Sequence, residues 1–243
     1  MGEFVNLRSE DLDRSIYRFS TFSRLVEHFR TGQMALVRPE KWDDPFENYI
    51  VGVRFETGGG HLDLGLRHTF HGSCWTRKSV SDALWRIYSP DKLSVRIRST
   101  PRILGKCLDA ALAKYSRSKW FVGRVTYLPQ RKIIARATTL ARHILKDRSE
   151  VAAANSLLFK RNSFAHEDEV RILVIDRHQK ARQGVLKVAL DPHEVVHSVL
   201  VDSRAPADLV DVYSSYLKDK LGFKGRVSRS TLYSPPGRLV VKL

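Results

Sequence analysis

Short apolar segments alternate irregularly with amphipathic ones along the chain, and this order constrains the fold more than any other feature. Strand candidates include residues 16–19 (IYRF), 70–76 (FHGSCWT), 93–99 (LSVRIRS) and 169–175 (EVRILVI). They lack the regular strand–helix–strand order of a doubly wound parallel sheet. A chain of 243 residues can bury one substantial core. We therefore predict a single α+β domain over residues 1–243, with a mixed or antiparallel sheet flanked by helices.

Two segments carry clear helix signals. After Ser20, an N-cap candidate, apolar residues follow at helical spacing up to Gly32. Residues 131–147 form an amphipathic pattern in which Lys132 and Arg136 share the polar stripe. Both segments are therefore predicted to be helices with one buried face.

The chain is strongly basic. It has 42 Lys and Arg against 26 Asp and Glu, a formal net charge of +16. Such a field attracts polyanions, above all nucleic acid, although an acidic protein partner is an open alternative. Basic residues are densest in the middle of the chain, and we predict that Arg96, Arg98, Lys132 and Arg136 contact nucleic acid. An ordinary solvated face would look similar.

Several features predict a cytoplasmic protein without membrane attachment. Cys74 and Cys107 are too few for a disulfide framework or a cysteine-based zinc site, and we expect both to be buried thiols. No apolar stretch approaches the roughly 20 residues of a membrane span. The first 15 residues lack the apolar region of a secretory signal.

The segment SFAHEDEVRILV (residues 163–174) holds the most suggestive acids. If it is a strand, Glu167, Glu169 and Arg171 share one face, with neighbours on that face roughly 6.6 Å apart. One carboxylate could stabilise an oxocarbenium-like centre while the other deprotonates a nucleophile, and Arg171 would keep its neighbour ionised. The alternative is an exposed strand edge with ordinary ion pairs.

A metal site is not predicted. The segment does not complete H-E-x-x-H, because Val170 occupies the position of the second histidine. A metal-dependent nuclease built on Pro90–Asp91 and an E-x-K strand would need lysine at Arg171. That interpretation remains the weaker enzyme alternative.

Polar and aromatic residues earlier in the chain could complete a ligand site. Ser73 and Thr76 lie on a strand candidate, and Trp85 and Tyr88 are three residues apart in a short helix candidate. The two rings could close over a planar ligand, although aromatic residues at this spacing also occur in cores. In the first strand, Tyr17 and Arg18 lie on opposite faces.

In their order, these motifs resemble a large family of uncharacterised bacterial proteins. The matching segments are IYRF, WDDPFEN, GSCWTRKSVSDALWRIYS and FKRNSFAHEDEVRIL, which together span nearly the whole chain. Three positions depart from the family pattern: Asp43 replaces its usual Asn, Trp75 replaces its Phe, and Arg86 lies inside the W-x-x-Y motif.

That layout is in turn similar to ADP-ribosyltransferase toxins that modify nucleic acid. The resemblance implies a split sheet and NAD as substrate, without a metal. It implies that Arg18 or Tyr17 holds NAD, that Ser73 or Thr76 supplies a hydroxyl, and that Tyr88 with Trp85 covers the nicotinamide. It makes Glu169 the catalytic acid, with Glu167 helping to present the acceptor.

The sequence therefore predicts an NAD-dependent mono-ADP-ribosyltransferase that modifies a nucleic acid, RNA slightly ahead of DNA. The resemblance implies a bacterial toxin or phage-defence effector, which an antitoxin protein could mask. The main alternative is a basic nucleic-acid-binding protein without catalysis.

Overall fold

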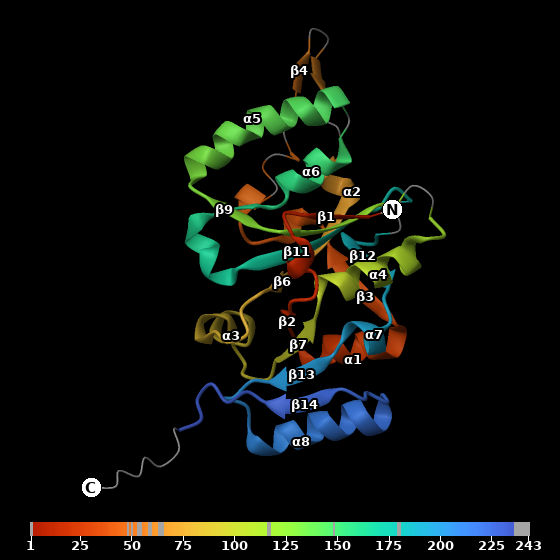
Figure 1. Cartoon of the computed structure of the whole chain (residues 1–243), viewed down its shortest axis with the longest axis vertical. Coiled ribbons are helices and arrows are strands. Elements are labelled where there is room, and N and C mark those ends of the chain that lie inside the picture. Colours follow the sequence, from red (N-terminus) through yellow and green to blue (C-terminus); the bar gives the residue numbers. More distant parts are fainter. Residues whose placement is uncertain are drawn as a thin grey trace, which may run out of the picture.

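The computed structural model describes residues 2–235, except residues 48, 50, 53, 54, 58, 59, 63–65, 116, 117, 148, 179 and 180. Its main feature is a ten-stranded sheet (Figure 1). Eight of its strands follow one another in the order β1 (Glu3–Val5), β8 (Trp120–Arg124), β11 (Glu169–Ile175), β6 (Phe70–Thr76), β2 (Ile16–Ser20), β7 (Val95–Ser99), β13 (Ser198–Val201) and β14 (Arg226–Arg229). The pairs β1–β8 and β13–β14 are parallel, and the other neighbours on this path are antiparallel. The predicted α+β class with a mixed sheet is confirmed.

The sheet splits at β6. Near the end of β6, Thr76 pairs with Tyr17 of β2, whereas Gly72 pairs with Val37 of β3 (Gln33–Val37). Strand β12 (Val185–Ala189) then pairs with β3. The strands beyond β6 therefore belong to two arms, β2–β7–β13–β14 and β3–β12, which confirms the predicted split.

Helices and two small pairs of strands surround this sheet. The helices are α1 (Phe22–Thr31), α2 (Leu66–Thr69), α3 (Asp82–Tyr88), α4 (Pro101–Leu112), α5 (Gln130–Asp147), α6 (Glu150–Ser156), α7 (Pro192–Val195) and α8 (Ala207–Ser215). Two separate pairs of strands are β4 (Phe55–Thr57) with β5 (Gly60–Leu62) and β9 (Thr126–Leu128) with β10 (Phe159–Arg161). Helix α5 follows the predicted pattern, with its apolar stripe buried and Lys132 and Arg136 exposed.

Helix α1 begins one residue later than its expected cap. Thr21, rather than Ser20, accepts a hydrogen bond from the backbone N–H of Arg24, because Ser20 is still the last residue of β2. Gly32 ends the helix with a φ of 65°, a left-handed conformation that glycine adopts without strain.

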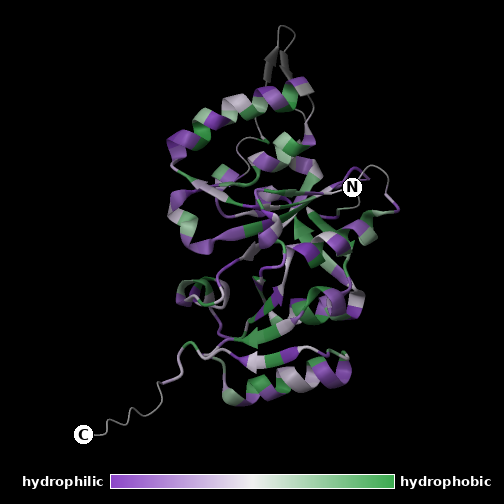
Figure 2. Ribbon diagram, viewed as in Figure 1, coloured by the Kyte–Doolittle hydropathy of each residue, from purple (hydrophilic) through white to green (hydrophobic). Residues whose placement is uncertain are grey.

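Two apolar clusters pack on the two faces of β11. Val170, Ile172 and Val174 belong to the cluster that includes residues of β2, β3, β7 and β13, whereas Leu173 and Ile175 pack with α5 and α6. Figure 2 shows β13 as a mainly hydrophobic strand and α5 as a helix with many hydrophilic residues. Every residue of β11 is buried, so the alternative of an exposed strand edge is wrong.

Membrane and thiol predictions have different outcomes. Within the described ranges, no helix is long and apolar enough to cross a bilayer. Cys74 and Cys107 are both free thiols, but each is only partly buried. The expectation of two buried thiols is therefore wrong in its degree of burial.

Candidate functional site

Glu167 and Glu169 meet at one buried site, but not by strand alternation. Glu169 is the first residue of β11, whereas Glu167 ends a 3-10 helix over Asn162–Glu167. Asp168 between them has a φ of 42°, which turns the chain, and the Thr76 hydroxyl donates to the Glu167 carbonyl. The predicted shared strand face is therefore wrong in geometry, although both carboxylates still lie together.

Lys160 joins the two acids, and sequence reasoning missed it. From β10, its Nζ donates to a Glu167 carboxylate oxygen and to Glu169 Oε1 at 2.6 Å, and it lies 2.9 Å from Glu47 Oε1. Its side chain is buried. The available signal was a single lysine directly after the apolar run LLF, since a buried lysine needs acidic partners.

Arg171 holds Glu169 from the other side. Its Nε donates to Glu169 Oε2 at 2.7 Å, its Nη2 to Glu47 Oε2 at 2.8 Å, and its Nη1 to the Leu157 carbonyl at 2.7 Å. The guanidinium also lies over the Trp42 ring, 4.5 Å from its centroid. The WDDPFEN loop thus supplies Glu47 and Trp42 to support the acid site.

The pKa values of the two acids are shifted in opposite directions. Burial acts to raise the pKa of Glu169, but Arg171 and Lys160 outweigh it and hold that pKa below its ordinary value. Burial and the neighbouring Glu169 carboxylate raise the pKa of Glu167 to about 8. Burial raises the pKa of the third acid, Glu47, although Arg171 and Lys160 oppose this shift. The site thus combines a fixed carboxylate with an acid that exchanges its proton near neutral pH.

Two cavities meet at these acids. The inner cavity, about 70 Å³, is lined by Tyr17, Arg18, Thr76 and Tyr88 together with Glu167 and Glu169. The outer cavity, about 310 Å³, has the same two acids and Tyr88 in its wall, with Trp42, Phe164 and His166 around them. A molecule in either cavity could therefore reach the acids.

Tyr88 lies where the two cavities meet. The residue is 44% exposed, but its hydroxyl is 3.5 Å from Glu167 Oε1. Burial of the hydroxyl and the charge of Glu167 raise the pKa of Tyr88, which keeps the phenol protonated. The side chain thus offers a hydrogen-bond donor at the acids and a ring face to a ligand.

Arg18 connects the inner cavity to a third one in the split of the sheet. This split cavity, about 250 Å³, is lined by Arg18, Arg24, His28 and Lys187 among others. Among the residues that the structure describes, the Arg18 side chain has no hydrogen bond or ion pair, and burial lowers its pKa to about 10. A half-buried guanidinium without an acidic partner is suited to bind an anionic ligand.

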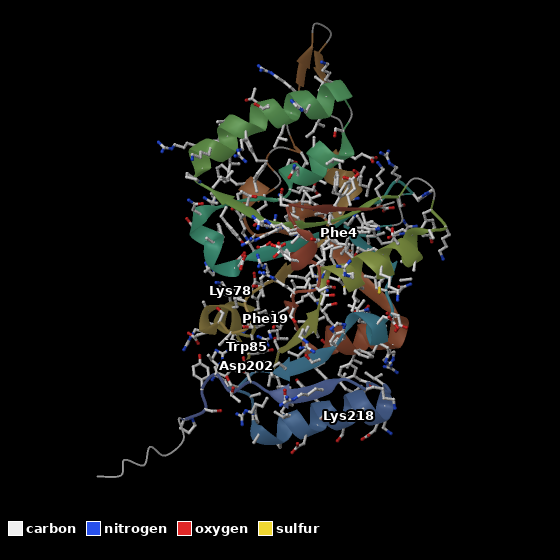
Figure 3. All side chains as sticks on the ribbon, in the orientation of Figure 1. Phe4, Phe19, Lys78, Trp85, Asp202 and Lys218 are labelled. Carbon is white, nitrogen blue, oxygen red and sulfur yellow. The ribbon has the colours of Figure 1, made fainter. Side chains whose placement is uncertain are left out.

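Trp85 and Ser73 do not line these cavities. Trp85 is 1% exposed and packs edge-on against Phe19, with ring centroids 4.8 Å apart (Figure 3). Ser73 is buried opposite Ile172 of β11. The expected pair of covering rings is therefore reduced to Tyr88, and the hydroxyl at the acids comes from Thr76. Trp85 therefore belongs to the core, which is the alternative that the sequence left open for aromatic residues at helical spacing.

The four predicted nucleic-acid contacts lie outside the three cavities. Arg96 stacks over the Tyr17 ring at 4.2 Å and donates to the Ser79 carbonyl, so part of its capacity is used within the protein. Arg98, Lys132 and Arg136 are exposed. Their contact with nucleic acid stays a prediction.

The nuclease alternative gains no support from the geometry. Asp91 lies in a turn, where its Oδ1 accepts from the backbone N–H of Leu93 at 3.0 Å, and it lines neither cavity at the acids. In the described ranges, no group of three or more His, Cys, Asp or Glu residues is arranged to hold a metal ion. The three carboxylates around Lys160 instead bind an ammonium group.

Comparison with known proteins finds structural likeness alone. No protein-family model matches the sequence, and no curated protein matches it, so membership of the bacterial family described above stays a prediction. Three solved structures of DarT from Thermus sp. 2.9 are similar: complexes with ADP-ribosylated single-stranded DNA, with carba-NAD+ and with NAD+. They are 11%, 13% and 12% identical, with TM-scores of 0.43, 0.40 and 0.40, over 90% of this chain and 95–96% of DarT. At this level of similarity, function has to be argued from the site.

Proposed function

We propose that this protein is an NAD-dependent mono-ADP-ribosyltransferase whose acceptor is a nucleic acid. The observation that carries the proposal is a buried pair of acids in the shared wall of two cavities, with pKa values shifted in opposite directions. Transfer of ADP-ribose needs a carboxylate beside a cationic centre and a base for the nucleophile, with donor and acceptor arriving from different directions.

The inner and split cavities fit the donor. NAD carries a diphosphate, which Arg18 can bind because its guanidinium lies between these two cavities without an acidic partner among the described residues. Its planar nicotinamide fits against the Tyr88 ring at the inner cavity, where the Thr76 hydroxyl also lies. NAD would thus extend from the split of the sheet to the two acids.

The chemistry uses Glu169 as a fixed anion and Glu167 as a base after it has lost its proton. The bond from C1′ of the ribose to the nicotinamide nitrogen breaks, and nicotinamide leaves with the bonding electrons. Glu169, kept ionised by Arg171 and Lys160, stabilises the positive charge on the ribose. A nucleophilic atom of the acceptor then bonds to C1′ and gives its proton to Glu167, which must be deprotonated at that moment.

The outer cavity and the net charge support a nucleic-acid acceptor. The aromatic rings of Trp42 and Phe164 line the outer cavity, where an unpaired base can enter and pack against them. The net charge of +16 favours contact with phosphates. One DarT structure holds ADP-ribosylated single-stranded DNA, so DNA is tested beside RNA as acceptor. A toxin or phage-defence role belongs to the same proposal.

The test is release of nicotinamide from NAD, with transfer of ADP-ribose to single-stranded RNA and DNA oligonucleotides followed by mass spectrometry. We expect turnover with at least one of them, and we expect Glu169→Gln to abolish it while the circular dichroism spectrum is kept. Glu194→Gln, which removes an exposed acid of α7 that lines none of the three cavities, is the matched control and should stay active.

Full activity of Glu169→Gln would refute the assignment of the catalytic acid. Failure of millimolar NAD to raise the melting temperature of the protein would contradict the proposal as a whole, since a ligand that binds the native state stabilises it. Oligonucleotide binding without nicotinamide release would instead favour the non-catalytic alternative.

A further inference from the structure

A fourth cavity lies beside the acid site and is rich in arginine. Its volume is about 390 Å³, and its lining includes Arg8, Arg14, Arg77 and Arg124, which we call the arginine cluster. These residues come from three segments of the chain: Arg8 and Arg14 from the β1–β2 connection, Arg77 from after β6, and Arg124 from the end of β8. The fold therefore gathers four guanidinium groups at one position.

The nearby carboxylates do not accept hydrogen bonds from all the N–H donors of these guanidinium groups. Glu10 and Asp11 also line the cavity. Asp11 Oδ1 is 3.5 Å from both Arg14 and Arg77, so one carboxylate is divided between two cations. Each guanidinium has five N–H donors, and long contacts of this kind leave most of them free for another acceptor.

The remaining ion pairs of the cluster are equally long. Arg8 lies 3.4 Å from Glu10, and Arg124 lies 3.3 Å from Asp168. Elsewhere in this protein, the Arg102–Asp13 pair has both contacts at 2.6 and 2.8 Å. Counting Asp168, four arginines face three carboxylates, which leaves an excess of positive charge.

Arg77 independently indicates a binding site, because it has a buried donor without a partner among the described residues. Its side chain is 16% exposed, and its Nη1 is buried without a hydrogen-bond partner among the described residues. Buried polar nitrogens of native proteins are nearly always paired. A tetrahedral anion fits such a cluster because its oxygens accept bidentate hydrogen bonds from guanidinium groups.

The cluster is tied directly to the catalytic acids. Arg77 follows Thr76, and its backbone N–H donates to the carbonyl of Asp168, the residue between Glu167 and Glu169. Arg124 contacts the side chain of the same Asp168. An anion bound here would therefore be held at a fixed position relative to the acid pair.

We propose that the arginine cluster binds a backbone phosphate of the acceptor strand, and so sets which nucleotide reaches the acids. This inference rests on the proposed function in that it takes the acceptor to be a nucleic acid. The same phosphate chemistry occurs in the diphosphate of NAD, so the experiment separates the two sources. Phosphate contacts of this kind position a strand without reading its bases.

The probes are a fluorescent single-stranded oligonucleotide and the same strand with abasic residues, titrated against the full chain without NAD. The variant is Arg8→Gln with Arg14→Gln, whose side chains are 82% and 58% exposed, so folding is spared. We expect affinity for both probes to fall about tenfold at low salt. The slope of log affinity against log salt should become shallower by about 0.7 for each phosphate that the protein no longer neutralises.

A second variant, Arg77→Gln, tests the more buried member of the cluster, with the circular dichroism spectrum as the check on folding. The matched control is Arg226→Gln, an exposed arginine on β14 at the opposite end of the sheet (Figure 1). It removes the same charge and should leave affinity nearly unchanged. An equal loss in the control would show a general charge effect and overturn the proposal.

The stabilisation of the protein by NAD separates this inference from the proposed function. We expect the arginine variants to keep the full rise in melting temperature with NAD. If they lose that rise but bind oligonucleotides normally, the cluster serves a nucleotide diphosphate and the proposal is wrong. If the unaltered protein shows no NAD effect while the variants still lose oligonucleotide affinity, the proposed function fails and the phosphate site stands.

Discussion

Replacing Lys160 by methionine tests whether the buried ion cluster is organised as described. The substitution keeps most of the side-chain volume but removes the ammonium group that contacts Glu47, Glu167 and Glu169. For Glu169 Oε1 at 2.6 Å, the attraction is about 6 kcal/mol at an effective dielectric constant of 20. Desolvation of the lysine offsets part of this, and breaking a buried ion pair costs about 3–5 kcal/mol of unfolding free energy.

The loss should depend on pH. Without Lys160, Arg171 alone faces the buried carboxylates, and a carboxylate left unpaired can be neutralised by a proton. At pH 5 that proton is readily available, whereas at pH 8 it is not. We therefore expect the unfolding free energy of the variant to be reduced more at pH 8 than at pH 5.

The assay is urea denaturation of both proteins at the two pH values, followed by circular dichroism. Lys187→Met is the matched control, because the exposed Lys187–Glu27 pair at 2.7 Å should contribute little. A loss for Lys160→Met below about 1 kcal/mol, the range of a surface pair, or one that is the same at both pH values, would refute the reasoning.

Three further predictions concern single side chains in or next to the site. The unfolding free energy should fall as pH rises from about 5 to 8. The reason is that folded Glu167, with its pKa raised to about 8, binds a proton more tightly than the unfolded chain does. Glu167→Gln should flatten this pH dependence in urea titrations. Trp85→Ala should reduce the unfolding free energy by about 3–5 kcal/mol, because it truncates a core side chain. Tyr88→Phe should leave the unfolding free energy nearly unchanged and lower nicotinamide release. A larger loss of unfolding free energy for Tyr88→Phe than for Trp85→Ala would contradict the placement of these rings. Arg18→Gln should weaken NAD binding in isothermal titration calorimetry without changing oligonucleotide affinity, and an unchanged Kd for NAD would remove Arg18 from the donor site.

Local sequence patterns predicted the elements of the fold well. Alternation identified β11 and its buried residues Val170, Ile172 and Val174, and helical periodicity identified α5 with its exposed basic stripe. These predictions succeed because each depends on neighbours within a few residues, whose side chains share a face set by backbone geometry.

The positions of the two acids could not be predicted from local sequence patterns. Strand alternation would place Glu167 on β11, but the turn at Asp168 brings it to the site from a 3-10 helix. The sequence order of the two acids predicted their proximity, yet the geometry depends on the Thr76 hydroxyl, 91 residues from Glu167 in the chain. Helical spacing likewise predicted that Trp85 and Tyr88 share one face of a helix. It did not predict that Trp85 is buried in the core and Tyr88 exposed.

By itself, the sequence determined the class of the fold, the residue types available for chemistry and the strong positive charge that favours a polyanionic partner. Only the tertiary structure decided that Lys160, Arg171 and Glu47 enclose the acids, since Glu47 lies 124 residues from Arg171 in the chain. The physical reason is that protonation depends on burial and on charges within a few ångströms, and distant segments supply both. Glu167 and Glu169 are the same residue type, two positions apart, and the surrounding fold alone makes one a fixed anion and the other an acid that titrates near neutral pH.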